Sequence, residues 1–270
     1  MIKTAHDIDV PALGFGTWKL TGEDAREGVR HALSIGYRHI DTAQIYRNEA
    51  EVGEGWKASG VPRSDFFLTT KVWIDQLRPD DVASSTRESL HKLQTDHVDL
   101  LLIHWPSRDV PVEDTLGAMM RLREQGLTRS IGVSNFTPTQ FAHAATLAPL
   151  LTNQVEYHPL LSQDALLQTL RTNESLLTAY SPLAQGRVFD EPALIDISES
   201  RGVSVGQVVL AWLLAQDSVV AIPRSTSATH RQDNFGALQL DLTDDETARI
   251  DALDREMRLA NPDFAPDWER

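Results

Sequence analysis

The chain has 270 residues, of which 41% are hydrophobic, so it can bury a sizeable core, and its formal net charge is −14. It contains no cysteine, which excludes disulfide bonds, thiolate nucleophiles and cysteine metal ligands and fits a reducing compartment. The negative charge argues against nucleic acid and anionic membranes as partners, because both repel an acidic surface.

The N-terminal segment contains no targeting signal that can be recognised. The stretch MIKTAHDIDVPALG lacks the apolar core of a signal peptide, and no apolar run reaches the roughly 18 to 20 residues of a membrane span. We therefore expect a cytoplasmic protein. Residues 2–12 alternate in polarity and turn at His6 and Asp7, which predicts a small β-hairpin.

Short apolar strands then alternate with amphipathic helices along the chain. The predicted strands are residues 12–16, 37–41, 66–71, 99–104, 130–134, 152–156, 176–181 and 219–223. The predicted helices are residues 23–36, 48–60, 79–93, 112–126, 137–148, 163–173, 191–202, 204–216 and 227–238. Strands that alternate with helices in this way indicate a parallel sheet.

Eight β-then-α units in about 250 residues are the number and size of a (β/α)₈ TIM barrel. An open doubly wound sheet is the alternative, but GFGTW at residues 14–18 lacks the glycine fingerprint G-x-G-x-x-G. One more helix and a proline-broken tail are expected in residues 243–270. We therefore predict an α/β fold in which residues 1–270 form a single barrel domain, with the hairpin capping its floor.

Four ionisable residues lie at or just after the ends of the predicted strands. Asp41, Lys71 and His104 end the second, third and fourth strands, and Tyr46 lies in the loop after the second. Each alone has an ordinary explanation: a helix cap, a solvated lysine, a hydrogen-bonded core histidine or a packing residue. All strand ends of a barrel open on one face, where active sites lie, so together they indicate a catalytic cluster.

The four side chains are chemically complementary. A free phenol has a pKa near 10, and an ammonium group beside it would lower that pKa and make Tyr46 a better acid. Lys71 could supply the ammonium group if Asp41 held it in place, and His104 could orient a substrate carbonyl. No metal site is expected, because the nine histidines include no H-x-x-x-H pair.

Eight stretches of the sequence, three of which contain these four residues, resemble the aldo-keto reductase family in order and spacing. They are LGFGTWK, GYRHIDTAQIYRNEAEVG, TTKVW, DLLLIHWP, IGVSNF, NQVEYHP, AYSPLAQG and IPRS. The resemblance implies a (β/α)₈ barrel, a nicotinamide cofactor and reduction of carbonyl groups to alcohols. It also implies that Asp41, Tyr46, Lys71 and His104 are the catalytic tetrad, with Tyr46 as the proton donor. Within the family, the tail RLANPDFAPDWE is similar to that of the bacterial 2,5-diketo-D-gluconate reductases of the B type.

The same resemblance implies a set of cofactor-binding residues. They are Ser134, Asn135 and Gln154 for the carboxamide, Tyr180 for stacking on the nicotinamide, Ser181, Leu183 and Gly186 along the pyrophosphate, Arg224, Ser225, Thr226 and His230 for the 2′-phosphate of NADP, and Asp233 and Asn234 for the adenine. The family usually has lysine at position 224 and arginine at position 230, so His230 is a departure, although Arg231 is adjacent. We expect NADPH as the cofactor, with weaker use of NADH.

Trp18, Trp73 and Trp105 follow three of the strand ends and are expected to form the substrate pocket with Tyr46 and His104. Such a pocket suits small dicarbonyls such as methylglyoxal, keto-sugars such as 2,5-diketo-D-gluconate, and aromatic aldehydes. Family relatives are mostly monomeric, so we expect a monomer. A non-catalytic barrel that binds the cofactor as a redox sensor or regulatory subunit is the alternative. A barrel hydrolase or isomerase would need a carboxylate pair or a metal at the mouth, and the sequence shows neither.

Overall fold

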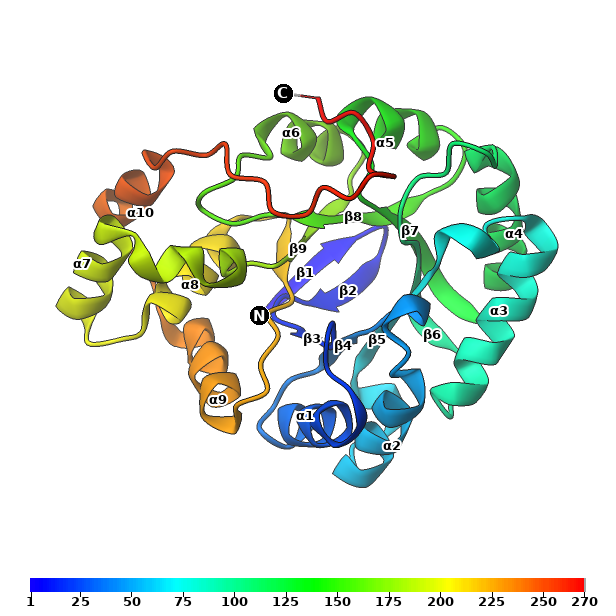
Figure 1. Cartoon of the computed structure of the whole chain (residues 1–270), viewed down its shortest axis with the longest axis horizontal. Coiled ribbons are helices and arrows are strands. Elements are labelled where there is room, and N and C mark those ends of the chain that lie inside the picture. The colour runs from blue at the N-terminus through cyan, green and yellow to red at the C-terminus, as the bar shows by residue number, and fades with distance from the viewer. Residues whose placement is uncertain (270) are drawn as a thin grey trace.

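The computed structural model describes residues 1–269, and its central element is a parallel sheet of eight strands in the order β10-β9-β8-β7-β6-β5-β4-β3. The strands are β3 (Phe15–Gly16), β4 (His39–Asp41), β5 (Phe67–Val72), β6 (Val98–Ile103), β7 (Thr128–Ser134), β8 (Leu150–Glu156), β9 (Leu176–Tyr180) and β10 (Val219–Ala221). Helices surround the sheet on the outside (Figure 1). They are α1 (Gly22–Ser34), α2 (Glu49–Ser59), α3 (Pro79–Lys92), α4 (Val112–Glu124), α5 (Pro138–Ala145), α6 (Asp164–Thr172), α7 (Pro192–Arg201), α8 (Val205–Ala215), α9 (Ala228–Gly236) and α10 (Asp244–Asp251).

The first and last strands meet and close the sheet into a barrel. Leu13 and Ala221 form a parallel bridge, and the N–H of Gly14 donates to the carbonyl of Ala221 at 2.8 Å. The N–H of Gly16 donates to the carbonyl of Pro223 at 3.0 Å. The predicted (β/α)₈ barrel with an additional C-terminal helix is therefore confirmed.

The strand ends differ from the prediction by a few residues. The last strand ends at Ala221 instead of Pro223, because proline has no N–H to give to a strand ladder. The third barrel strand continues one residue further, to Val72, so Lys71 is its next-to-last residue. These shifts leave the alternation of side chains unchanged.

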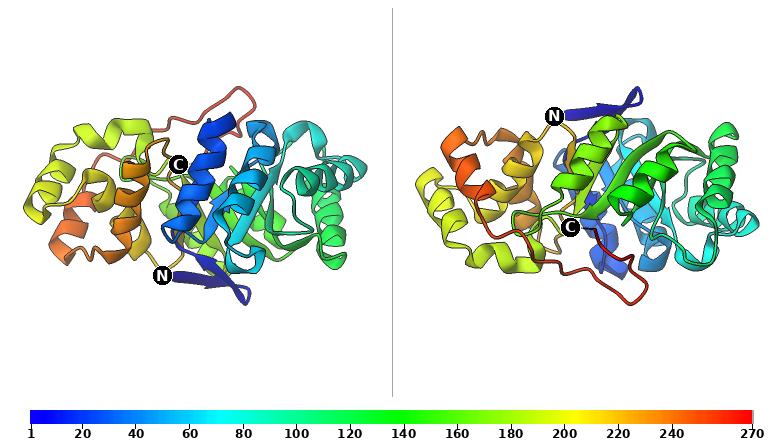
Figure 2. Two further views of the ribbon diagram at one scale, coloured as in Figure 1. Left: turned by 90° about the horizontal axis from the view of Figure 1, so that it is seen from below. Right: turned by 90° about the horizontal axis from the view of Figure 1, so that it is seen from above.

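The predicted N-terminal hairpin is also confirmed. Strands β1 (Ile2–Ala5) and β2 (Ile8–Pro11) pair antiparallel, and His6 and Asp7 both have positive φ, as a type I′ turn requires. The side chains of Ala5 and Val10 pack with inward-facing residues such as Phe67 and Leu100. Figure 2 shows the hairpin at the end of the barrel opposite to the C-terminal tail, so it closes the floor.

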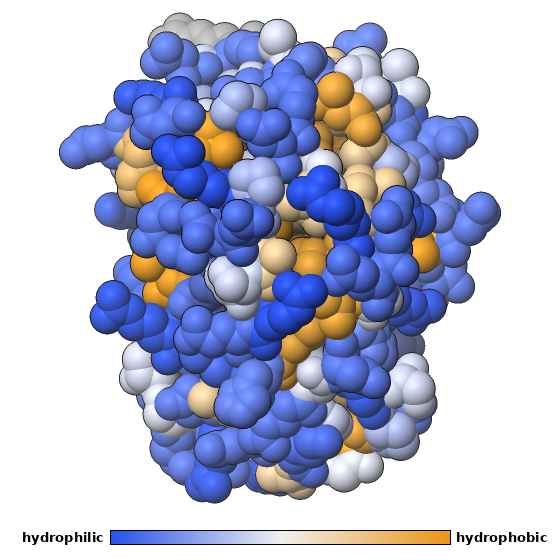
Figure 3. Space-filling view, turned by 90° about the vertical axis from the view of Figure 1, so that its right-hand side faces the viewer, coloured by the Kyte–Doolittle hydropathy of each residue, from blue (hydrophilic) through white to orange (hydrophobic). Residues whose placement is uncertain are grey.

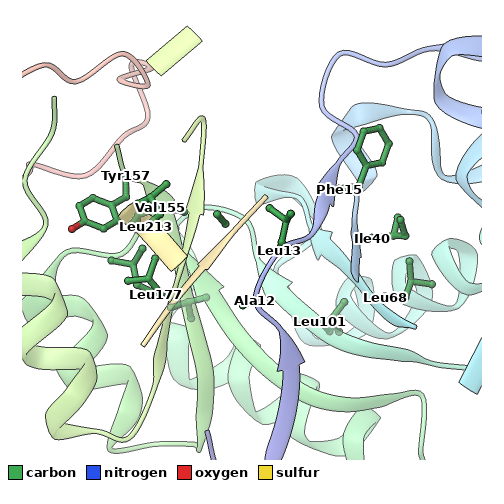
Figure 4. Close-up of a cluster of buried hydrophobic side chains, with 14 of the residues drawn as sticks. Ala12, Leu13, Phe15, Ile40, Leu68, Leu101, Val155, Tyr157, Leu177 and Leu213 are labelled. Atoms are coloured by element: carbon green, nitrogen blue, oxygen red, sulfur yellow. The ribbon is translucent and has the colours of Figure 1, made fainter. Parts of the chain in front are cut away.

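The main hydrophobic core lies between the strands and the helices. Leu13, Ile40, Leu68, Leu101 and Leu177 point outward from their strands and are fully or almost fully buried (Figure 4). Most helices bury an apolar stripe against this layer and expose a polar side, whereas α8 is apolar and buried nearly all round. The face that carries α3 and α4 is accordingly mostly hydrophilic, with apolar side chains in separate patches (Figure 3). Within residues 1–269, no helix is long and apolar enough to cross a membrane.

Candidate active site

Strand alternation aims three of the four predicted catalytic residues into the barrel mouth. Successive side chains of a strand point to opposite faces, so residues two apart share a face. Lys71 shares the face of Phe67, and His104 that of Leu100 and Leu102, and those three apolar residues belong to the inward-facing cluster. Asp41 is the last residue of β4. The sequence thus places these side chains together by periodicity alone.

Tyr46 comes from a short turn that is held in place from two sides. It ends the 3₁₀ turn Gln44–Tyr46, and Arg47 follows with a positive φ of 56°. The side-chain carbonyl of Gln44 accepts a hydrogen bond of 2.9 Å from the N–H of Trp73, which ties the turn to the next loop of the mouth. The Tyr46 and His104 rings lie edge to face with centroids 5.6 Å apart.

The carboxylate of Asp41 links the cluster together. Lys71 Nζ donates to Asp41 Oδ1 at 2.5 Å and to the carbonyl of Thr42 at 2.8 Å, and it lies 3.4 Å from the hydroxyl of Tyr46. The second carboxylate oxygen, Oδ2, accepts a hydrogen bond of 2.7 Å from Gln154 Nε2. Lys71 has no exposed surface and Asp41 almost none, so this ion pair is dry.

Burial has the largest effect on the pKa values of Tyr46, Lys71 and His104. Desolvation raises the pKa of Tyr46 well above that of a free phenol, and the charge of Asp41 adds to the effect. Desolvation lowers the pKa of Lys71, against the opposing charge of Asp41. It also lowers the pKa of His104 well below its ordinary value, with a contribution from Lys71. The net shift of the Tyr46 pKa is upward, because burial and the charge of Asp41 raise it, and the lowering effect expected of Lys71 stays a prediction.

These residues open on one cavity of about 970 Å³. Of the residues expected at the site, those that line it are Trp18, Asp41, Tyr46, Trp73, His104, Trp105, Asn135, Gln154, Tyr180, Ser181, Leu183, Gly186, Arg224, Ser225, Thr226, His230, Asp233 and Asn234. Lys71 lies behind Asp41 and Tyr46. Ser134 is buried, with its hydroxyl donating to the carbonyl of Gln154 at 2.7 Å.

One side of the cavity carries a hydrogen-bonded set of amides. Asn135 Nδ2 donates to the carbonyl of His104 and to Ser134 Oγ, both at 3.0 Å. The hydroxyl of Tyr180 donates to Asn135 Oδ1 at 2.8 Å, which holds the ring of Tyr180 at the cavity wall. The Tyr180 pKa is raised by burial, so this hydroxyl stays a donor.

The far end of the cavity lies at the N-terminus of α9. Arg224 and His230 line it, and Arg224 Nε donates to the carbonyl of Trp18 at 3.2 Å. Arg231 does not line it: its Nη1 donates to the carbonyls of Ser225 and Thr226 at 3.0 and 3.1 Å. Arg231 is thus used to hold the loop, and Arg224 is the arginine that faces the cavity.

Residues that the sequence did not single out complete the other end. Leu259, Ala260, Asn261, Pro262 and Phe264 of the C-terminal tail line the cavity. The ring of Phe264 meets those of Trp73 and Trp105 edge to face, with centroids 5.7 and 5.4 Å apart. Lys19 and Ile45, next to Trp18 and Tyr46 in sequence, line it as well. The signals that could have identified Lys19 and Ile45 are their places beside Trp18 and Tyr46, within two of the stretches that resemble the family.

Within residues 1–269, no group of three or more histidine, aspartate or glutamate side chains could hold a metal ion. The geometry therefore defines a class: a parallel barrel with an ionisable Asp-Lys-Tyr-His cluster at the mouth of one long cavity, whose other end carries basic side chains at a helix N-terminus.

Comparison with known proteins agrees with this class. The chain belongs to the aldo/keto reductase family, whose sequence profile matches residues 12–255, and aldo-keto reductases are oxidoreductases that use nicotinamide cofactors. It is 41% identical to the methylglyoxal reductase DkgB of Yersinia pestis, over 97% of this chain and all of that protein. It is 39% identical to the glyoxal reductase of Bacillus subtilis, over 97% of this chain and 96% of that protein.

Solved structures show the same likeness. A crystal structure provisionally assigned as 2,5-diketo-D-gluconic acid reductase B superimposes with a TM-score of 0.97 at 45% identity, covering all of this chain and 97% of the other. An aldo-keto reductase of Bombyx mori in complex with NADP superimposes with a TM-score of 0.90 at 31% identity, covering 99% of this chain and 97% of the other. The resemblance to the family and to the B-type reductases, expected from the motifs, is confirmed.

Proposed function

We propose that this protein is an NADPH-dependent carbonyl reductase that converts small aldehydes and ketones to alcohols. The observation that supports this most is the continuity of the cavity. The same space is lined by Tyr46 and His104 at one end and by Arg224 and His230 at the other. A site of that extent suits a long ligand with an anionic end and a reactive end.

The residues present fit a nicotinamide cofactor. A carboxylate can only accept hydrogen bonds, so Gln154 must turn its amide nitrogen toward Asp41 and keep its Oε1 as an acceptor. Asn135 Oδ1 accepts from one hydroxyl and has a second lone pair. Two acceptors of this kind would bind the amino group of the carboxamide. Ser134 would act by holding Asn135, and the ring of Tyr180 would stack on the nicotinamide.

The rest of the cavity would hold the remainder of the cofactor. The turn through Ser181 and Gly186, with Leu183 between them, would follow the pyrophosphate; Ser181 and Gly186 have positive φ. The N-terminus of α9 would receive the 2′-phosphate, because free N–H groups at a helix start favour anions. Arg224, Ser225, Thr226 and His230 line the cavity there, and Asp233 and Asn234 would contact the adenine.

When bound, the reduced nicotinamide would supply a hydride to the carbonyl carbon. Tyr46 would give its proton to the carbonyl oxygen, and its raised pKa keeps that proton in place until then. Lys71, held by Asp41, would stabilise the resulting phenolate across the 3.4 Å contact. His104 is neutral and its Nδ1 is buried without a partner in residues 1–269, so its proton belongs on Nε2, which could donate to the same oxygen.

The substrate end is mostly aromatic. Trp18, Trp73, Trp105 and Phe264 line this end of the cavity, which suits small or flat substrates with few specific polar contacts. Two relatives are named methylglyoxal reductase and glyoxal reductase, which supports small dicarbonyls as substrates. Keto-sugars such as 2,5-diketo-D-gluconate and aromatic aldehydes remain in the proposed range.

The proposal is tested by steady-state kinetics with methylglyoxal, 2,5-diketo-D-gluconate and an aromatic aldehyde, each with NADPH and with NADH. We expect oxidation of NADPH that requires a carbonyl substrate. Tight NADPH binding without turnover of any carbonyl would instead support the non-catalytic, cofactor-sensing barrel.

A further inference from the structure

The C-terminal tail is an irregular segment that needs specific anchors. After α10 it runs over the upper part of the barrel toward α5 (Figure 1), at the end opposite to the hairpin (Figure 2). Backbone hydrogen bonds fix its first part: the N–H of Ser162 donates to the carbonyl of Arg255, and the N–H of Met257 to that of Leu160. Beyond Met257 the segment reaches the cavity and its ladder of backbone contacts ends.

Beyond that point, a buried carboxylate holds the backbone of the tail. Glu156 has no exposed surface and is the last residue of β8, two positions after Gln154. Its carboxylate accepts from the N–H of Leu259 at 2.9 and 3.0 Å and from the N–H of Ala260 at 2.8 Å. The Nε2 of His158, also fully buried, lies 3.0 Å from Glu156 Oε1. One strand thus carries both the proposed carboxamide ligand and the anchor of the tail.

Only a carboxylate satisfies this arrangement. Two backbone N–H groups and one imidazole N–H converge on Glu156, and a carboxylate offers acceptors to all of them. A glutamine would present its own N–H groups to at least one of these donors. If His158 changed tautomer to accept from it, the proton would move to Nδ1, which is buried and has no partner in residues 1–269. Either way a buried donor would be left unpaired.

A second anchor lies at the far end of the tail. Glu269 accepts from Thr137 Oγ1 at 2.6 Å, from the N–H of Thr139 at 3.2 Å and from Thr139 Oγ1 at 3.0 Å, at the start of α5. Between the anchors, Phe264 stands edge to face against Trp73 and Trp105. The tail is therefore held by a carboxylate at each end, and between them Arg108 Nη2 donates to the carbonyl of Ala265 at 2.9 Å, beside the ring that enters the substrate end of the cavity.

We propose that Glu156 is a positioning residue for substrate selection: it fixes Leu259 and Ala260, and through them it sets Phe264 as the wall of the substrate end. This rests on the proposed function. Substrates that fill the aromatic wall should depend on Glu156, and substrates too small to reach Phe264 should not. The role is separate from the proton and hydride steps, which belong to the tetrad and the cofactor.

The test compares methylglyoxal and phenylglyoxal, which differ in a methyl against a phenyl group beside the same dicarbonyl. Glu156→Gln should raise KM for phenylglyoxal at least about fivefold, because an aromatic contact is lost. The kcat/KM for methylglyoxal and the Kd for NADPH should change less than about twofold. Hydrogen exchange should accelerate at the amides of Leu259 and Ala260, because a glutamine offers them one neutral acceptor oxygen where the carboxylate offers two charged ones.

Asp99→Asn is the matched control. Asp99 is also a buried carboxylate that accepts a backbone N–H, from Leu68 at 2.9 Å, but it pairs with Arg63 and Arg129 and does not touch the tail. It should leave the ratio of the two substrates unchanged. An equal loss for both substrates in Glu156→Gln, or the same selectivity change in Asp99→Asn, would overturn the proposal.

Two further measurements test the proposal if the variant does not fold or the wild-type protein is inactive. If Glu156→Gln does not fold, Phe264→Ala should show the same selective rise in KM, and failure to do so would contradict the proposal. If the wild-type protein reduces neither of these substrates nor any other carbonyl of the kinetic panel, the proposed function fails. Hydrogen exchange then tests Glu156 by itself, and an unchanged rate at Leu259 and Ala260 would refute the anchor.

Discussion

Gln154 and Asp41, 113 residues apart in sequence, are joined by a hydrogen bond of 2.7 Å between Nε2 and Oδ2. The other oxygen of Asp41 pairs with Lys71 at 2.5 Å. One buried carboxylate thus orients the ammonium group beside the proposed acid and the amide that faces the proposed nicotinamide site. Loss of this carboxylate should therefore disturb both proton transfer and cofactor binding, whereas loss of Lys71 should disturb proton transfer alone.

The first prediction follows from the two hydrogen bonds that the carboxylate of Asp41 accepts, from Lys71 and from Gln154. An asparagine at position 41 has one acceptor oxygen, so it cannot accept from both Lys71 and Gln154. Asp41→Asn should lower kcat about 10- to 100-fold, the effect of losing a charge-assisted hydrogen bond, and should also weaken NADPH binding several-fold. Lys71→Met should lower kcat further, by at least about 10²-fold, and leave the Kd of NADPH unchanged. Equal NADPH affinities in the two variants would contradict the shared role of Asp41.

The second prediction concerns the acid. Tyr46→Phe keeps the ring but removes the proton donor, so reduction should fall by roughly 10² to 10⁴. NADPH affinity, followed by quenching of tryptophan fluorescence, should stay the same. Tyr157→Phe is the control, since it removes another buried hydroxyl, which donates to Gln216 Oε1 at 2.9 Å and lies outside the cavity. Normal turnover in Tyr46→Phe would exclude Tyr46 as the donor.

Much of this site could be predicted from the sequence, because the alternating pattern of the strands determines which side chains reach the barrel mouth. Asp41, Lys71 and His104 stand at or next to the ends of strongly patterned strands, and parallel strand ends share one face. Phe264 and Glu156 could not be found in this way. The tail has no repeating pattern, and Glu156 reads as the last residue of a strand until the backbone that it binds, 103 and 104 residues later, is seen. The motif IPRS points to Arg224, which lines the cavity, but that Arg231 turns away to hold Ser225 and Thr226 depends on the packing of one loop.

The third prediction concerns stability. His39 is fully enclosed in the barrel, between the carbonyl of Pro11 and the hydroxyl of Thr69, and burial lowers its pKa. Below about pH 6.5, His39 is protonated in the unfolded chain but stays neutral in the folded protein. The free energy of unfolding therefore falls as pH falls, by at most about 1.4 kcal/mol per pH unit. His39→Asn should remove this part of the dependence. Denaturant titrations at pH 7.5 and 5.5 measure it, and an unchanged difference between the two pH values would contradict a neutral, buried His39.

The last prediction concerns cofactor choice. The 2′-phosphate is the only difference between NADPH and NADH, and Arg224 can bind it through a planar fork. Arg231 is occupied with the carbonyls of Ser225 and Thr226, so it does not replace the arginine that the family resemblance leads us to expect at position 230. We expect a preference for NADPH in kcat/KM that His230→Arg widens, because a guanidinium is permanently charged. Arg224→Ala should raise KM for NADPH about tenfold or more and leave NADH nearly unaffected, since a charge-assisted hydrogen bond is worth roughly 1.5 to 3 kcal/mol. Steady-state kinetics with both cofactors decide the question: equal losses would mean that Arg224 binds the shared pyrophosphate and that the 2′-phosphate lies elsewhere.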